Sequence, residues 1–163
     1  MIKTALAAAA VLAFALPAAA PASAQAPTAP DIKTYASSAD VQALIANARK
    51  IHKAEPTLIQ PLLSLAPYRA SLEYRTAVGP AAVHEKEAEF FYVIDGSGVL
   101  VTGGKLKDEK RQNATNLGGT GVDGGQSRTV AKGDFIVVPE GTPHWFSDIK
   151  GELILMSLHV PRG

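Results

Sequence analysis

From residue 57 onward, short apolar segments alternate with glycine- and proline-rich turns. Runs of β-branched and aromatic residues are typical of strands, and glycine or proline between them is typical of chain reversals. We expect strands at 58–65, 68–77, 90–94, 98–102, 135–138 and 153–160, with a further strand beginning at His144. Many short strands joined by turns favour an all-β sandwich or barrel.

A helical pattern precedes these strands. Between residues 39 and 53, apolar side chains recur at spacings of three and four, at Val41, Leu44, Ile45, Ala48 and Ile51. Ser37 or Ser38 is a suitable N-cap, and Pro56 stops the helix. The apolar stripe predicts packing on the barrel or on a second subunit. The glycine-rich, polar segment 104–132 predicts a long connection, with a strand or hairpin as the alternative around 116–122.

One stretch, residues 133–148, combines a strand, a turn and a histidine. The apolar strand is followed by Pro139 and Gly141, and His144 begins the next strand. Proline and glycine prevent a regular ladder from continuing, so the chain must reverse here. A histidine held at such a turn has its backbone position fixed before any ligand binds, which suits a metal or substrate site.

The spacing of Gly133, Pro139, Gly141 and His144 resembles the second motif of the cupin superfamily, G-x5-P-x-G-x2-H-x3-N. The last position departs from the motif, because Asp148 stands where Asn is usual. This resemblance implies an all-β fold: a double-stranded β-helix, the cupin jelly-roll barrel, with a short N-terminal helix. The cupin domain would cover residues 37–163, with its barrel core at about 72–160.

The family's first motif, G-x5-H-x-H-x3 or x4-E-x6-G, is matched in part. His84, Glu89 and Gly96 occupy the places of the second histidine, the glutamate and the final glycine, but Ala82 stands at the first histidine. A gapped alternative makes His84 the first histidine and Lys86 the second. Under either alignment, one of the family's usual four ligands is missing.

The resemblance implies a metal site inside the barrel, held by His84, Glu89 and His144. Two histidines and one carboxylate leave coordination positions open, and they suit one divalent transition metal such as Fe, Mn, Ni or Zn. We expect Glu85 and Glu87 to face solvent, although a carboxylate there is an alternative to the missing histidine.

Further candidates for the site follow from strand alternation and side-chain chemistry. Phe91 shares a face with Glu89, and Phe146 shares one with His144, so both are expected to line the substrate pocket. Lys86, Tyr74 and His159 are candidates for moving a proton, and Arg75 is a further polar candidate at the barrel mouth. His159 has a structural alternative, a hydrogen-bonded histidine at a strand end.

The resemblance leaves two functions open. Cupins include dioxygenases, isomerases and lyases, and they also include non-catalytic binders of sugars, organic acids or aromatic metabolites. We expect a metal-dependent enzyme acting on a small molecule, with the binder as the alternative. A homodimer is a further expectation, because the apolar helix beside the barrel offers an interface.

The first 24 residues have the pattern of a secretory signal peptide. An apolar run at 5–15 is followed by Ala22-Ser23-Ala24, a signal-peptidase type of site, and the run is too short to span a bilayer. Residues 25–36 would form an extended leader. We expect a periplasmic or secreted protein without a membrane anchor after cleavage.

Charge and cysteine content narrow the class further. Removing the signal leaves 15 basic and 15 acidic residues, so nothing calls for nucleic acid as a partner. The chain has no cysteine, so its stability depends on its core or on a metal.

Overall fold

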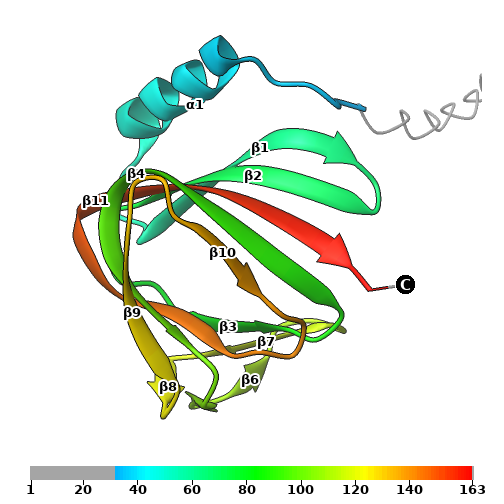
Figure 1. Cartoon of the computed structure of the whole chain (residues 1–163), viewed down its shortest axis with the longest axis vertical. Helices are drawn as coiled ribbons and strands as arrows, with labels where there is room; N and C mark the ends of the chain where they lie inside the picture. The colour runs from blue at the N-terminus through cyan, green and yellow to red at the C-terminus, as the bar shows by residue number, and fades with distance from the viewer. Residues whose placement is uncertain (1–31, 163) are drawn as a thin grey trace, which may run out of the picture.

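A computed structural model of the protein describes residues 32–162. The elements in this range are α1 (Ser38–Ile51), β1 (Thr57–Leu65), β2 (Tyr68–Arg75), β3 (Ala81–His84), β4 (Glu87–Thr102), β5 (Lys105–Lys107), β6 (Lys110–Arg111), β7 (Asn116–Gly119), β8 (Gly121–Asp123), β9 (Gln126–Ala131), β10 (Phe135–Val138) and β11 (His144–Pro161). The predicted all-β fold with one short N-terminal helix is confirmed (Figure 1).

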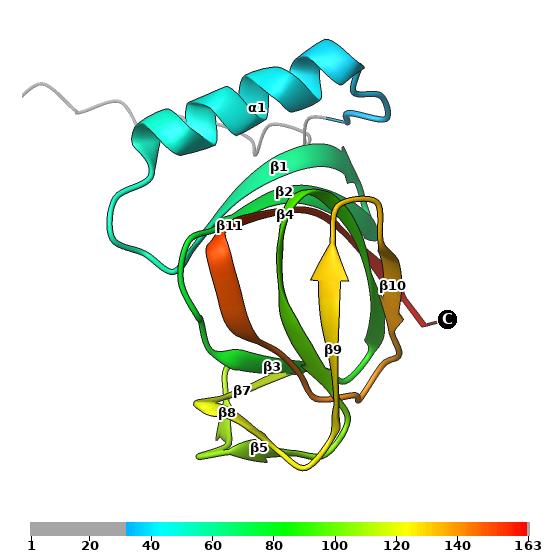
Figure 2. The ribbon, with the colours of Figure 1, turned by 60° about the vertical axis from the view of Figure 1, so that its left-hand side comes forward.

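Two long strands, β4 and β11, connect the walls of the barrel. They pair with each other, while β4 also pairs with β9 and β10, and β11 also pairs with β2 and β3. The predicted strands 90–94 and 98–102 are two parts of β4. Likewise, the strand predicted to start at His144 continues through 153–160 as β11. The barrel therefore curves around one interior, as Figure 2 shows.

Helix α1 covers the outside of β1 and β2, as both views show (Figures 1 and 2). It begins at a capping box, in which Ser37 and Asp40 each bond the other's backbone N–H. Its apolar side packs on the barrel, where Ile45 and Ala48 contact a cluster with Leu72, Tyr74 and Ile154. A second, separate core fills the barrel interior and includes Phe91, Leu100 and Phe146.

The predicted signal peptide, residues 1–24, lies outside the described part of the chain, as does most of the predicted leader. At the end of the leader, Lys33 forms an antiparallel bridge with Ser64 on β1. Across residues 32–162, no helix combines the length and the hydropathy needed to cross a bilayer.

Leu72→Ala is expected to destabilise the protein by about 2–5 kcal/mol, because it removes a fully buried side chain between β2 and α1. Leu65→Ala is the matched control. Leu65 is 43% exposed on β1, so its loss should cost about 1 kcal/mol or less. Urea unfolding of both variants measures the difference. Equal losses of unfolding free energy would show that Leu72, at the contact between helix and barrel, stabilises the protein no more than the exposed Leu65 does.

Candidate metal centre

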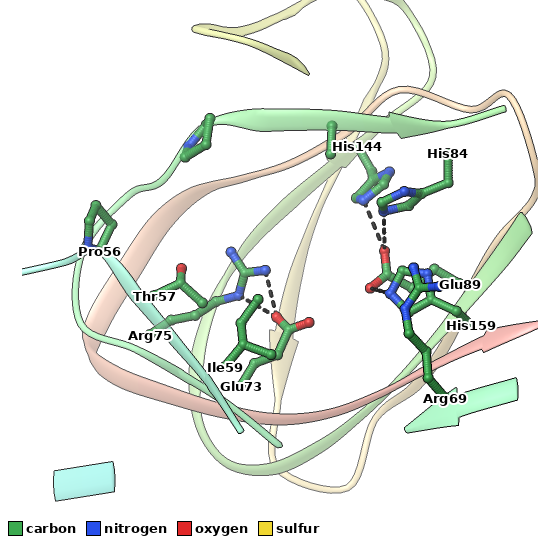
Figure 3. A pocket seen from close by; sticks show the side chains of 12 residues that line it. Pro56, Thr57, Ile59, Arg69, Glu73, Arg75, His84, Glu89, His144 and His159 are labelled. Atoms are coloured by element: carbon green, nitrogen blue, oxygen red, sulfur yellow. Dashed lines mark hydrogen bonds and ion pairs between the residues drawn. The ribbon is translucent and has the colours of Figure 1, made fainter. Parts of the chain in front are cut away.

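A cavity of about 460 Å³ opens into one end of the barrel. Alternation along the strands turns one set of side chains into it, and these come from β1, β2, β3, β4 and β11. The lining residues are Pro56, Thr57, Ile59, Arg69, Glu73, Arg75, Pro80, Ala82, His84, Glu89, His144 and His159 (Figure 3). The lining therefore combines a few apolar residues with a group of charged and imidazole side chains.

Glu89 lies at the centre of this group. Its Oε2 is 3.2 Å from Nε2 of His84 and 3.1 Å from Nε2 of His144, and its Oε1 is 3.1 Å from Nε2 of His159. Strand pairing produces this convergence, because His159 lies opposite Glu89 across β11 and β4. Glu89, His144 and His159 are buried and His84 is partly buried, so the four side chains meet at the inner wall of the cavity.

The second ring nitrogen of each histidine is held by an oxygen atom. Nδ1 of His84 is 2.8 Å from Oδ1 of Asn116, and Nδ1 of His144 is 3.2 Å from the Thr142 carbonyl. Nδ1 of His159 is 2.8 Å from Oε2 of Glu87. Such partners fix the orientation and tautomer of metal-binding histidines in other proteins.

Glu87 is itself anchored by an arginine. Nη1 and Nη2 of Arg69 donate to the two Glu87 carboxylate oxygens at 3.1 and 2.8 Å, a bidentate pair. The expectation that Glu87 faces solvent is therefore corrected, since it is half-buried against His159. Glu85 does lie at the surface, where it pairs with Arg111.

The turn expected around Pro139 and Gly141 places His144 beside β3, the strand that carries His84. Gly141 has a φ of +69°, and its N–H donates to the His84 carbonyl at 2.8 Å. This bond ties the start of β11 to the end of β3. His144 and Ala82 are paired there.

Electrostatics hold Glu89 in its charged form. Burial raises its pKa, but hydrogen bonds from His144, His159 and His84 outweigh burial and keep the pKa of the Glu89 carboxyl well below its usual value. For His84, burial lowers the pKa, because it disfavours the charged imidazolium. There, hydrogen bonds with Glu89 and Asn116 prevail over burial, and the pKa of His84 is raised.

The hydrogen bonds also show that this site fits a cation. Each Nδ1 faces an oxygen acceptor, so each ring carries a proton on Nδ1. Each Nε2 then faces a Glu89 oxygen, which only accepts when ionised. Two facing lone pairs repel each other, so each Nε2 must either hold a second proton or share a cation with the carboxylate.

The spacing of the donor atoms agrees with a metal ion. Two ligand atoms about 2.1 Å from one ion and at about 90–110° to each other lie roughly 3.0–3.4 Å apart. The three separations between histidine nitrogens and Glu89 oxygens are 3.1–3.2 Å. One ligand atom from each of His84, Glu89 and His159 also lies within 4.8 Å of the others. The residues present therefore fit a divalent metal ion.

The structure thus brings together the three residues expected to bind metal, His84, Glu89 and His144. It adds His159, which the sequence suggested only as a proton-transfer group or a strand-end histidine. The group with mutually close ligand atoms contains His159 in place of His144. Ala82, at the place of the missing histidine, does face the cavity.

Two candidates for proton transfer lie elsewhere, and their expected positions are corrected. Lys86 is exposed in the turn between β3 and β4, so the gapped alignment that makes it a ligand is wrong. Tyr74 is buried against α1, on the opposite face of β2 from the cavity. Alternation places its neighbours Glu73 and Arg75 inside instead.

The expected pocket residues Phe91 and Phe146 are also corrected. Both point into the barrel, as predicted, but they are 1% and 3% exposed and belong to its packed core. Their rings contact each other, with centroids 5.4 Å apart, and the Phe91 ring lies 6.2 Å from that of His144. The two rings belong to the packed part of the interior next to His144, and the cavity occupies the other end of the barrel.

Comparisons with known proteins gave similar solved structures and one family match. A search of curated proteins gave no significant match. Among solved structures, the chain is similar to TT1209 from Thermus thermophilus (16% identity, TM-score 0.49, covering 71% of this chain and 94% of that one). It is also similar to BH2720 from Bacillus halodurans (18%, TM-score 0.48, 73% and 79%) and to KdgF from a Halomonas species (19%, TM-score 0.47, 69% and 86%).

The family assignment rests on a sequence model of the whole barrel. The model for the family described as Cupin matches residues 46–159, which include every cavity-lining residue. The fold, the turn before His144 and this match lead to one conclusion: the chain belongs to the cupin family.

Proposed function

We propose that this protein is an exported, metal-dependent cupin that acts on a small molecule in the barrel cavity. One observation carries the proposal: three imidazole Nε2 atoms converge on one buried carboxylate, and each ring is fixed by an oxygen partner at Nδ1. Export to the periplasm or beyond is supported by the signal-like residues 1–24.

The proposed ligands are His84, Glu89 and His159, with His144 as the fourth. His159 would then replace the histidine missing at Ala82, since it reaches the same Glu89 from β11. When bound, the metal supplies Lewis-acid polarisation of a carbonyl or enolate, or redox chemistry if it is iron or manganese. Isomerase, lyase and dioxygenase reactions all use chemistry of these kinds.

A non-catalytic binder is the second candidate. It is favoured by the positions of Lys86 and Tyr74, since these two of the three proton-transfer candidates lie outside the cavity. Removing the metal distinguishes the two functions, because it has a different effect on each. An enzyme loses turnover of its substrate with the metal, whereas a binder whose metal is incidental retains its ligand affinity after chelation.

His159→Ala is expected to weaken zinc binding by about tenfold or more, because it removes one donor of the set. Competitive titration against a chromophoric chelator measures the affinity. The matched control is His52→Ala, since His52 contacts the Glu55 carbonyl and Thr76 outside the cavity and should leave zinc affinity unchanged. Unchanged affinity in the His159 variant would remove His159 from the ligand set.

A further inference from the structure

The cavity wall opposite the histidines carries an ion pair that the metal site does not use. On β2, Nε and Nη2 of Arg75 donate to Oε2 of Glu73 at 2.9 and 2.6 Å. The Arg75 guanidinium lies 4.6 Å from the centre of the Phe146 ring, which fixes its plane. Figure 3 shows this pair across the cavity from Glu89 and the three histidines.

Within the described part of the chain, the pair leaves one carboxylate oxygen and one guanidinium nitrogen without a partner. Among residues 32–162, Oε1 of Glu73 and Nη1 of Arg75 have no hydrogen-bond partner. Every fully occluded side-chain nitrogen or oxygen in this part of the chain does have one, so these two atoms are accessible. Both residues line the cavity, and Figure 3 shows their side chains within it.

This combination selects a particular functional group. A hydroxyl both donates and accepts, so it can donate to Glu73 and accept from Arg75. A carboxylate only accepts, and the charge of Glu73 would repel it. The wall formed by Glu73 and Arg75 therefore suits neutral hydroxyl groups better than an anion.

Charge balance places the anionic end of a ligand at the metal. Glu73 is paired with Arg75, and Glu87 with Arg69, so both pairs are neutral. A divalent ion with Glu89 and neutral histidines has a net charge of +1. One negative charge on the ligand would neutralise it.

We infer that the ligand of this cavity is a small hydroxylated monocarboxylic acid. Its carboxylate binds at the metal, and hydroxyls further along its chain bond Glu73 and Arg75. Apolar Pro56, Ile59 and Pro80 cover its C–H groups, and a cavity of about 460 Å³ falls in the range for small-molecule sites. The inference rests on the proposed function, because it requires a bound metal.

The test compares two acids on the zinc-loaded protein by calorimetry. D-gluconate and 2-hydroxyhexanoate have the same chain length and the same hydroxyacid end for the metal, but only gluconate carries distal hydroxyls. We expect gluconate to bind about tenfold more tightly, the effect of one or two well-made hydrogen bonds. Equal affinities, or no binding of either acid, would overturn the inference.

Two variants assign that preference to the ion pair. The double variant Glu73→Leu/Arg75→Met replaces the pair by apolar side chains of similar size, a change that folded proteins often tolerate. It should reduce the gluconate preference to about twofold, while zinc affinity stays within about twofold of wild type. Arg75→Lys, which keeps the charge but loses the planar fork, should lower the preference too and decides the matter if the double variant misfolds.

Failure of the inference can be separated from failure of the proposed function. Zinc affinity is measured first, without any acid present. If the wild type binds no zinc, the metal site itself is refuted, and the inference with it. If zinc binds and the gluconate preference survives in both variants, the metal site stands and the role of Glu73 and Arg75 is refuted.

Discussion

Glu89→Gln is expected to lower zinc affinity by more than about 100-fold. Glutamine has the same shape, but it lacks the negative charge that Glu89 brings to the three histidines. Loss of partners outside the ligand set typically costs 10–100-fold in metal affinity, so loss of the central anionic ligand should cost more. Competitive titration with a chelator of known affinity measures the change.

Glu85→Gln is the matched control for this prediction. Glu85 lies four positions earlier, in the turn before β4, and it pairs with Arg111 at the surface. Surface pairs of this kind contribute little, so zinc affinity should be unchanged and stability nearly so. If both glutamine variants bound zinc as tightly as the wild type, Glu89 would not be a ligand.

Gly96→Ala is expected to destabilise the barrel by about 3 kcal/mol or more. Gly96 has a φ of +82°, and an added Cβ would lie 2.0 Å from the backbone carbonyl oxygen of Glu152. A backbone atom on a paired strand cannot move aside easily, so β4 and β11 would have to separate there. These strands carry Glu89 and His159, so zinc affinity should fall as well.

Gly151→Ala separates this close approach from backbone strain. Gly151 has a similar φ of +78°, but nothing lies within 4 Å of an added Cβ. Its substitution should therefore cost only the strain of a left-handed residue, about 1–2 kcal/mol. Urea unfolding compares the two variants. Equal losses of unfolding free energy would mean that the close approach of the Glu152 carbonyl is not what requires glycine at position 96.

The sequence predicted the barrel well because its strands are short and apolar and are separated by clear turns. It also located three of the four converging residues, since His84, Glu89 and His144 follow motif spacing. His159 could not be recognised in this way. Its place beside Glu89 depends on the long-range register of β11 against β4, which no local spacing encodes.

The inward face of β2 was predicted only in part, because Arg75 was expected at the barrel mouth and lines the cavity, whereas Glu73 was not a candidate. Leu72 and Tyr74 are the apolar members of an alternating strand, which normally indicates that they face the main core. Here the helix forms a second core outside the barrel and takes that face, so Glu73 and Arg75 turn inward. The apolar face of β2 packs on the helix and its polar face lines the cavity, so the usual rule that polar residues face solvent gives the wrong orientation.

The segment 104–132 shows a different limit. The sequence predicted a long polar connection, with a strand or hairpin only around 116–122. The structure forms short strands from β5 to β9 across it. These strands are two to six residues long and rich in glycine and charge, so they lack the periodic pattern that identifies a strand. Asn116, which holds His84, was missed for the same reason.

The most direct test of the proposed centre is X-ray absorption spectroscopy at the zinc edge of the zinc-loaded protein. Scattering from imidazole rings counts histidine ligands. The proposed site predicts three histidines, with nitrogen at about 2.0–2.1 Å, together with oxygen from Glu89. Zinc surrounded by oxygen alone, or by a single histidine, would contradict the centre assigned to His84, Glu89, His144 and His159.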